Sequence, residues 1–240
     1  MFTRAADHLA IAGVTPISTL DYPDHLSCVI FTQGCPMRCG YCHNPQMISR
    51  QQAPDAPRWS DLRVFLEERA GLLQAVVFSG GEPTLQSALL AAVREAFALG
   101  YKIALHTSGV YPQRLKPLLP YLSWVGMDIK ALPEDYDQVC GRRGLYQGVE
   151  QSLELLLQSK VAQEVRITLH PNDFNLAKLA LLLEQLQEMG VRHCAIQLAR
   201  GGQCLDPAYR ELSNPFDPEQ LQTLINHLCV GFSRLELRNI

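Results

Sequence analysis

Three cysteines within eight residues carry the clearest chemistry in this chain. Cys35, Cys39 and Cys42 are separated by gaps of three and two residues. A structural zinc site takes four protein ligands, whereas each of the four irons of an iron–sulfur cubane needs one terminal ligand. A loop with three cysteines is therefore suited to hold three irons and to leave the fourth iron open to another ligand.

Three alternative roles for these cysteines stay open at this point. A zinc site needs a fourth ligand nearby, and the candidate is His43, although adjacent residues rarely reach one ion together. A four-cysteine cluster would need Cys140, which lies far along the chain. Redox-active or inert thiols are the third alternative.

A second chemical group follows an apolar run at residues 75–79. The sequence at residues 80–84 is Gly-Gly-Glu-Pro-Thr. Two glycines at a strand end let a ligand approach the backbone, and the proline removes one donor while holding the turn. Exposed carbonyls together with a carboxylate would form a pocket for a cationic amine. A simple tight turn before a helix is the alternative.

Short apolar runs alternate with longer amphipathic runs, a pattern typical of parallel strands and the helices that cover them. Ser60 is expected to cap a helix, Gly100 and Gly190 to follow helix ends, and Asp217 to cap a helix that starts at Pro218. The predicted strands are residues 27–32, 75–79, 102–107, 124–129, 164–169 and 193–198. The predicted helices are residues 60–70, 86–99, 111–119, 148–159, 176–189 and 218–228.

These strand–helix units are too few for a closed eight-unit barrel, which typically takes about 250 residues. We therefore predict an α/β fold, an incomplete (β/α)6 barrel with parallel strands, in a single domain over residues 1–240. Residues 1–26 form an extension with a hairpin or loose strand pair at 9–19, and residues 234–237 form a short last strand. Because active groups gather at the carboxyl ends of parallel strands, the cysteine loop after the first strand falls on that edge.

Composition and charge exclude several classes of partner. The net charge is −3 and the pI is near 6.2, which gives no electrostatic footprint for nucleic acid or for an anionic membrane. The first residues lack the apolar core of a secretion signal, and no long apolar run suits a membrane span. A cytoplasmic location is expected, where cysteines are ligands or buried thiols rather than disulfides, and five scattered cysteines are expected to have structural roles. These are Cys28, Cys140, Cys194, Cys204 and Cys229.

Together the cysteine loop and the Gly-Gly-Glu-Pro turn resemble the radical S-adenosylmethionine (SAM) superfamily, whose hallmarks are a CxxxCxxC loop after the first strand and a similar turn after the second. The stretch at residues 31–45 is similar to the activating enzymes of glycyl-radical enzymes. The segments at 107–109, 127–130 and 164–168 are similar to the branch that activates the anaerobic ribonucleoside-triphosphate reductase. The resemblance spans roughly residues 10–200.

The resemblance implies that Cys35, Cys39 and Cys42 bind three irons of a [4Fe–4S] cluster and that SAM chelates the fourth. Reductive cleavage of SAM would give methionine and a 5'-deoxyadenosyl radical, which can take a hydrogen atom from a glycine α-carbon. This chemistry belongs to the cofactors, so the protein contributes orientation, tuning of the cluster and exclusion of competing reactions. Lys130 joins the cysteines in the implied catalytic set because it would bind the SAM carboxylate.

The resemblance also implies the remaining cofactor contacts. Glu82 and the backbone of Gly80 and Gly81 would take the amine of SAM. Asp128 would also take the amine, and its spacing from Lys130 places both side chains on one face of a strand. An ordinary ion pair is the alternative for these two residues. The other expected cofactor-binding residues are Tyr41, which would shield the cluster edge or the adenine, and Thr107, Ser108 and Arg166.

Some polar residues depart from the family pattern. His106 stands where related activating enzymes often place an acid, and it is either a ligand contact or a satisfied polar residue at a strand end. Arg200 lies near the place where some relatives carry a histidine. Arg166 would be costly to bury without a partner, which favours a role in the site. His43, His170 and Gln197 are weaker candidates.

The predicted function is the installation of a glycyl radical on a partner enzyme, with anaerobic ribonucleotide reductase as the first candidate and an enzyme similar to pyruvate formate-lyase as the second. An electron donor such as flavodoxin or ferredoxin is expected. One rival is a radical reaction on a small molecule, as in a deazaguanine precursor synthase. Another rival is a non-catalytic iron–sulfur or zinc module. An open mouth for a protein substrate would favour the activating function.

Overall fold

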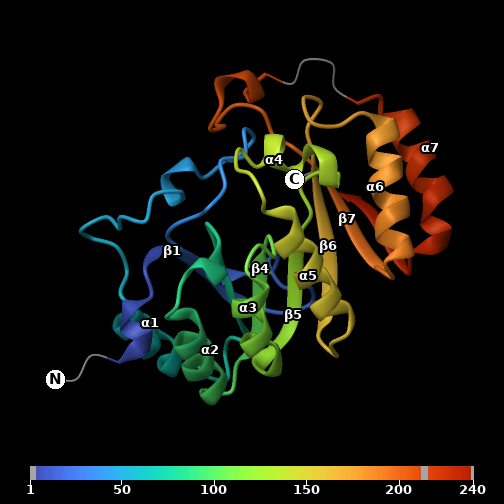
Figure 1. Cartoon of the computed structure of the whole chain (residues 1–240). Helices are drawn as coiled ribbons and strands as arrows, with labels where there is room; N and C mark the ends of the chain where they lie inside the picture. Colours follow the sequence, from blue (N-terminus) through green and yellow to red (C-terminus); the bar gives the residue numbers. More distant parts are fainter. Residues whose placement is uncertain (1–3, 212–215, 239–240) are drawn as a thin grey trace.

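The computed structural model describes residues 4–211 and 216–238. In these residues eight strands form one sheet in the order β1 to β8, so every strand pairs with its neighbours in sequence (Figure 1). β1 runs antiparallel to β2, and all later pairs are parallel. The predicted α/β fold with a parallel sheet is confirmed.

The strands match the predicted runs closely. All six predicted inner strands form, the predicted last strand becomes β8, and β1 is the extension strand. Their bounds are β1 Ile11–Ser18, β2 Ser27–Thr32, β3 Ala75–Gly80, β4 Lys102–Thr107, β5 Leu122–Asp128, β6 Ala162–Leu169, β7 His193–Leu198 and β8 Arg234–Arg238. The segment at 9–19 therefore contributes one strand that pairs with β2, not a hairpin within itself.

The helices cover one face of the sheet, and α6 and α7 pack side by side near β7 and β8 (Figure 1). The predicted helix at 111–119 is wrong in its second half, which is a 3₁₀ helix at Lys116–Tyr121 containing Pro117 and Pro120. The helix bounds are α1 Trp59–Glu68, α2 Leu89–Ala98, α3 Pro112–Leu115, α4 Tyr136–Val139, α5 Tyr146–Leu157, α6 Leu176–Glu188 and α7 Pro218–Leu228.

Most of the predicted helix ends are confirmed. The Asp217 side chain accepts hydrogen bonds from two backbone amides of the first turn of α7, at 2.9 Å each. Gly100 and Gly190 follow α2 and α6 with φ of 91° and 100°. The prediction for Ser60 is wrong, because α1 already begins at Trp59 and its cap position has no side-chain hydrogen bond.

The two faces of the sheet differ in composition because successive side chains point to opposite sides. The outer face and the helices form the main core, which includes the fully buried Trp59 and Phe78. The inner face carries a smaller apolar cluster on β2–β5, around Val77 and Trp124, which Tyr22 covers. Towards β6–β8 the inner face becomes charged.

The sheet curves as an incomplete barrel. Within the described residues no hydrogen bonds join β1 to β8, so the two edge strands remain separate. Among the same residues, no helix has the length and the apolar content that crossing a membrane requires.

Candidate functional site

The cysteine loop begins directly after β2, at the carboxyl end of that strand, as the sequence predicted. Cys35, Cys39 and Cys42 all line one pocket of about 270 Å³. The other side of this pocket is formed by Gly80, Gly81, Asp128 and Lys130, which the sequence also singled out, and by Tyr41 within the loop. Residues far apart in the chain thus meet at one edge of the sheet.

Two distant segments support the cysteine loop. The amide of Arg38 donates to the carbonyl of Cys140 at 2.8 Å. On the other side, the amide of Leu205 donates to the carbonyl of Cys42 at 3.0 Å. The Tyr209 ring lies so close to Gly40 that any side chain at Gly40 would overlap it. The loop is therefore held in place by the protein.

Cys140, which was expected to be a structural thiol and was also the candidate fourth ligand of a four-cysteine cluster, lies beside the cysteine loop. It is fully buried, and its side chain lies against Cys39. A hydrogen bond from Cys140, together with the nearby charge of Lys130, lowers the pKa of Cys39 to about 7. Burial raises the pKa of Cys35 to about 12. No local pattern in the sequence announced this contact, because it depends on how residues 136–140 pack behind the loop.

The donor set suits a cluster better than a single ion. Among the described residues, no group of three or more His, Cys, Asp and Glu side chains is arranged to hold one metal ion. Thiolates that bind separate corners of a cubane need not converge on one point. The buried Tyr41 hydroxyl beside Cys39 also makes no well-formed hydrogen bond within the described residues. Three pocket-lining thiols with a polar neighbour are consistent with a [4Fe–4S] group.

Glycine is required at positions 80 and 81 because the turn after β3 lies very close to the chain that leaves β2. β2 and β3 end together, with Thr32 paired to Gly80, and Gly80 has a φ of 116° that disfavours other residues. A side chain at Gly81 would overlap the carbonyl of Gly34. The amide of Glu82 donates to that same carbonyl at 2.9 Å. This turn therefore fastens the GGEP segment to the start of the cysteine loop.

Glu82 is completely buried, and both oxygens of its carboxylate accept hydrogen bonds from the protein. Oε1 accepts from the Thr84 amide and hydroxyl and from the Thr107 hydroxyl, at 3.1, 2.6 and 2.7 Å. Oε2 accepts from the Ser108 amide and hydroxyl, at 2.8 and 2.5 Å. The predicted group of Glu82, Thr107 and Ser108 does meet, but in this structure its members bind one another.

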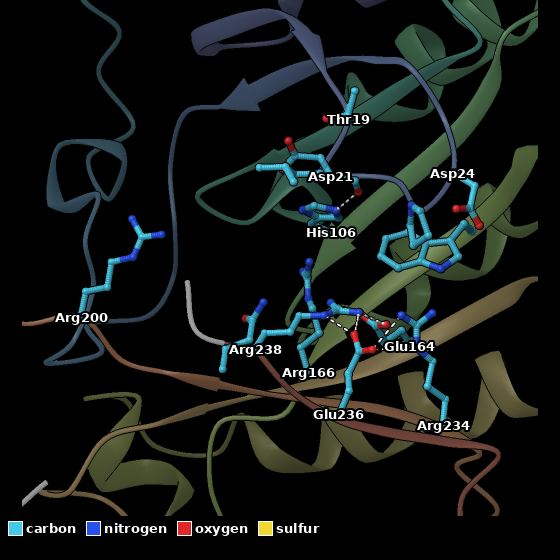
Figure 2. A pocket seen from close by; sticks show the side chains of 14 residues that line it. Thr19, Asp21, Asp24, His106, Glu164, Arg166, Arg200, Arg234, Glu236 and Arg238 are labelled. Carbon is cyan, nitrogen blue, oxygen red and sulfur yellow. Dashed lines mark hydrogen bonds and ion pairs between the residues drawn. The ribbon is translucent and has the colours of Figure 1, made fainter. Parts of the chain in front are cut away.

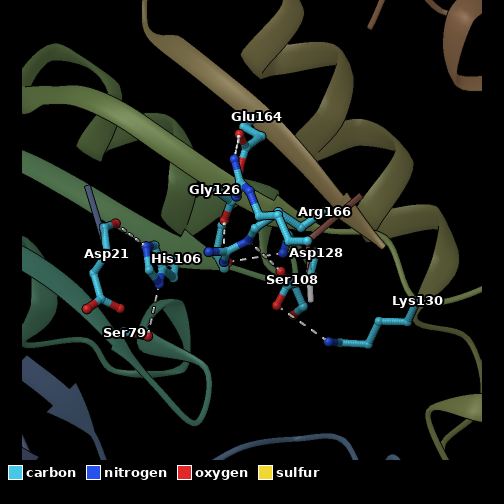
Figure 3. A network of polar contacts seen from close by, with 12 residues as sticks. Asp21, Ser79, His106, Ser108, Gly126, Asp128, Lys130, Glu164 and Arg166 are labelled. Carbon is cyan, nitrogen blue, oxygen red and sulfur yellow. Dashed lines mark hydrogen bonds and ion pairs between the residues drawn. The ribbon is translucent and has the colours of Figure 1, made fainter. Parts of the chain in front are cut away.

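Asp128, the last residue of β5, joins two cations, Arg166 within β6 and Lys130 just after β5 (Figure 3). Its carboxylate lies 2.9 Å from Arg166 Nε and 3.6 Å from Lys130 Nζ. Burial alone would raise the pKa of Asp128, but Arg166 and Lys130 lower it below its usual value. Burial would conversely lower the pKa of Lys130, and Asp128 raises it. Asp128 and Lys130 therefore both remain charged near neutral pH.

His106 lies at the boundary between two cavities. It lines a small pocket of about 80 Å³ together with Gly80, Lys130 and Arg166, which adjoins the cysteine pocket. It also lines a much larger cavity of about 820 Å³ on the inner face. Burial, and then the charge of Arg166, lower the pKa of His106 to about 3, so the ring is neutral.

The large cavity is lined mainly by charged side chains, and sequence reasoning missed Glu164 and the charged residues of β8 among them (Figure 2). Arg238 forms a two-pronged ion pair with Glu164, with both contacts at 2.7 Å. Arg234 donates to Glu236 at 2.7 Å. The charged residues of β8, and those of β6, are two positions apart, which is common in strands. Nothing in the sequence therefore indicated that the two strands share a cavity.

The remaining polar candidates separate into two groups. Gln197 and Arg200 line the large cavity, and His43 lines the cysteine pocket. His170 is buried away from these pockets. Its ring accepts a hydrogen bond from the Asn172 amide at 3.1 Å and packs on Tyr209, with ring centroids 4.5 Å apart. His170 therefore supports the segment behind the cysteine loop.

Two curated proteins are similar to most of this chain. A protein of Methanocaldococcus jannaschii described as a "putative glycyl-radical enzyme activating enzyme" is 26% identical over 217 residues, covering 87% of this chain and 88% of that protein. The pyruvate formate-lyase-activating enzyme of Clostridium pasteurianum is 26% identical over 188 residues, covering 75% of this chain and 78% of that enzyme.

Among solved structures, Streptococcus suis SuiB bound to S-adenosylmethionine has a similar fold. The TM-score is 0.64 at 14% sequence identity, and the match covers 88% of this chain. This chain spans about half of SuiB, since the match covers 49% of that protein. At this identity the likeness concerns the fold alone.

The family model of the radical SAM superfamily matches residues 29–183, which include the cysteine loop, the GGEP turn and the Asp128–Lys130 pair. The match covers more than half of the chain. The family identity agrees with the pocket, in which three thiols face two glycines, a carboxylate and an ammonium group. The chain belongs to the radical SAM superfamily and is an enzyme whose cofactors are a [4Fe–4S] cluster and S-adenosylmethionine.

Proposed function

We propose that this enzyme installs a glycyl radical on a partner protein, and that the partner is an anaerobic ribonucleoside-triphosphate reductase. The observation that carries the proposal is that a small pocket joins the cysteine pocket to a large cavity whose lining includes the segment after β1 and strand β8. Support comes from the similarity to proteins described as activating enzymes over most of both chains. An enzyme similar to pyruvate formate-lyase is the second candidate partner.

Five side chains have direct roles in this proposal. Cys35, Cys39 and Cys42 would hold three irons, and Lys130 and Asp128 would bind the carboxylate and the amine of SAM. When bound, the cluster and SAM supply a 5'-deoxyadenosyl radical. The protein contributes the orientation of SAM. The charged groups of SAM would replace partners in the ion pairs of Asp128, so no buried charge would be left without a partner.

The proposed role of the Glu82 carboxylate differs from the one that the sequence predicted. Glu82 already accepts five hydrogen bonds from the protein. We therefore propose that Glu82 fixes the turn and the ends of β3 and β4, and that the pocket-lining backbone of Gly80 and Gly81 contacts the amine. Thr107 and Ser108 hold Glu82 and shape the same wall. Tyr41 is proposed to cover the cluster edge.

Substrate access is proposed through the large cavity. His106 and Arg166 line both this cavity and the small pocket beside Lys130, so the two spaces adjoin. A glycine-bearing loop of a partner entering between β1 and β8 would reach this boundary. The reductant is proposed to be a flavodoxin or a ferredoxin, and the reaction is proposed to take place in the cytoplasm.

Anaerobic reconstitution tests the proposal directly. The reconstituted enzyme is mixed with SAM and a chemical reductant, and 5'-deoxyadenosine is measured with and without each candidate partner. A glycyl radical in the reductase, seen by electron spin resonance, together with one 5'-deoxyadenosine per radical, is the expected result. Formation of 5'-deoxyadenosine with no radical in any candidate partner would contradict the activating role.

The cavity volume favours a second candidate function, a radical reaction on a small charged molecule. A volume of about 820 Å³ lies in the range of small-ligand sites, which is about 300–1,000 Å³. The cavity wall also carries both arginines and carboxylates. Under this alternative, SAM cleavage would be stimulated by a small-molecule extract and not by a glycyl-radical enzyme.

A further inference from the structure

The hydrogen bonds of His106 fix one tautomer of its ring. Nε2 lies 2.7 Å from the carbonyl oxygen of Asp21, which can only accept, so Nε2 must donate (Figure 3). In a neutral ring Nδ1 then accepts, and the Ser79 hydroxyl 3.3 Å away is its donor. Ser79 directly precedes the two glycines of the GGEP turn. His106 therefore connects the turn of the cofactor pocket to a segment 85 residues away in sequence.

The segment that His106 contacts is the connection between β1 and β2, residues 19–26. Thr19, Asp21 and Asp24 of this connection line the large cavity opposite the charged wall of β6–β8 (Figure 2). The connection has little regular structure, and Asp24 adopts a φ of 62° that is uncommon outside glycine. Its position must therefore come from contacts with other parts of the molecule.

Aromatic packing provides the second set of contacts for this connection. The Tyr22 ring stacks on Trp124, with centroids 5.8 Å apart, and His25 stacks on Tyr22 at 4.0 Å. The His106 ring meets the same Trp124 edge to face at 5.6 Å. Trp124 and His106 thus form one platform on the inner face, and the connection 19–26 rests on it.

We propose that His106 is a positioning residue. It holds the connection 19–26 as a wall of the substrate cavity and fixes the position of that wall relative to the cofactor pocket. The imidazole acts through its two hydrogen bonds, not by proton transfer. The effect on coupling between SAM cleavage and substrate radical formation rests on the proposed function. The effect on the wall itself does not depend on that function.

Two substitutions separate the hydrogen bonds from simple packing. His106→Leu fills similar space but leaves the carbonyl of Asp21 and the hydroxyl of Ser79 without this partner. His106→Gln places an amide N–H at about the position of Nε2, so the bond to Asp21 is kept. His193→Leu is the matched control, because His193 is exposed at the start of β7.

Hydrogen–deuterium exchange of the peptide covering residues 19–26 is the first measurement. The amides of His25 and Leu26 are hydrogen-bonded, to Tyr22 and Gln74, and report on the position of the connection. We expect exchange in this peptide to be about tenfold faster in His106→Leu, with little change in α5 and α6, and near the wild-type rate in His106→Gln. Unchanged exchange at 19–26, or equal acceleration throughout the chain, would overturn the proposal.

The second measurement is the number of substrate radicals formed per 5'-deoxyadenosine. His106→Leu should lower this ratio about tenfold while His106→Gln recovers most of it. A loosened connection with a wild-type ratio would refute the role of the wall in coupling. Absence of a radical with the wild-type enzyme and every candidate partner would instead refute the proposed function, and the exchange result would still decide whether His106 holds the wall.

Discussion

The cofactor end and the cavity end of the inner face are built in different ways. At the cofactor end, the cysteine loop and the turn at residues 80–84 are short contiguous motifs, each placed by the end of one strand. At the cavity end, Asp21, Glu164 and Arg238 come from three separate parts of the chain. The residues proposed to bind the cofactors are therefore encoded mainly in local motifs, whereas the shape of the large cavity depends on the whole fold.

The charges at the two ends also differ. At the cofactor end Asp128 shares its carboxylate between Arg166 and Lys130, so an incoming zwitterion can exchange partners with this group. At the cavity end Arg238 and Glu164 satisfy each other through two hydrogen bonds and connect β8 to β6. The first arrangement suits binding, and the second suits support of the edge strand.

The largest expected effect is at the cysteine loop. Cys39→Ala should abolish the brown absorbance of the cluster and all SAM cleavage, because one of the three cysteine-bound irons loses its ligand. The control is Cys229→Ala, which removes an exposed cysteine and should leave both unchanged. Iron and sulfide content and 5'-deoxyadenosine are the measurements. Equal damage from both substitutions would contradict the ligand assignment.

Cys140→Ala sharpens this test, because Cys140 lies against Cys39. We expect a cluster with normal iron content that still binds SAM, since three cysteines suffice. Loss of the cluster in Cys140→Ala would instead indicate a four-cysteine cluster with no open iron. That result would remove the basis for SAM binding at the cluster.

Glu82→Gln should produce the next largest effect, on stability. The new amide group would face donors that now bind the carboxylate, and we expect a loss of about 3 kcal/mol in the free energy of unfolding. Urea denaturation of the apoprotein under anaerobic conditions measures it. Glu184→Gln, at an exposed position of α6, is the control. Normal stability with lost SAM affinity would show that Glu82 binds the amine directly, as the sequence predicted.

The strands of the sheet were predictable because the apolar runs of β2 to β7 are bounded by clear turn residues and are largely buried. The second half of the helix at 111–119 was predicted wrongly. Its amphipathic pattern indicated an α-helix, but Pro117 and Pro120 lack the amide hydrogens that an α-helix needs. Pattern reasoning locates an element more reliably than it locates the element's ends.

The site divides in the same way. Cys35 was identified from the spacing of the cysteines, and Gly81 and Lys130 were identified from the resemblance to radical SAM enzymes. The hydrogen-bond partners of Glu82 could not be found, since its contacts to Thr107 and Ser108 depend on the register of β3 and β4. The sequence therefore identified the residues of the site but not the contacts that they make with one another.

Lys130→Ala tests the cofactor end with a smaller effect. It removes the ammonium group proposed for the SAM carboxylate and leaves the Arg166–Asp128 pair in place. We expect a cluster of normal absorbance and about tenfold weaker SAM binding, equivalent to about 1.4 kcal/mol. Binding is measured by equilibrium dialysis on the reconstituted enzyme. Lys160→Ala, at an exposed position, is the control. Equal affinity in both variants would assign Lys130 to an ordinary ion pair.

The smallest expected effect is at the boundary between the two ends and depends on pH. Burial and the neighbouring charge of Arg166 lower the pKa of His106 to about 3, against 6.5 when the chain is unfolded. Below pH 6.5 the unfolded state therefore binds a proton that the folded state does not, so stability falls as the pH decreases from 6.5 towards 3. By pH 5.5 the expected loss from this residue is about 1 kcal/mol.

The comparison with His106→Gln isolates this contribution from all other titrating groups, including Asp21 and Asp128 nearby. Urea denaturation of both apoproteins at pH 7.5 and 5.5 should show a larger decrease for the wild type, because glutamine does not titrate. If the two proteins lost equal stability, the pKa of His106 would have to be the same in the folded and the unfolded states. The ring would then be hydrated, and the two ends of the inner face would be joined by water and not by the Asp21–His106–Ser79 chain.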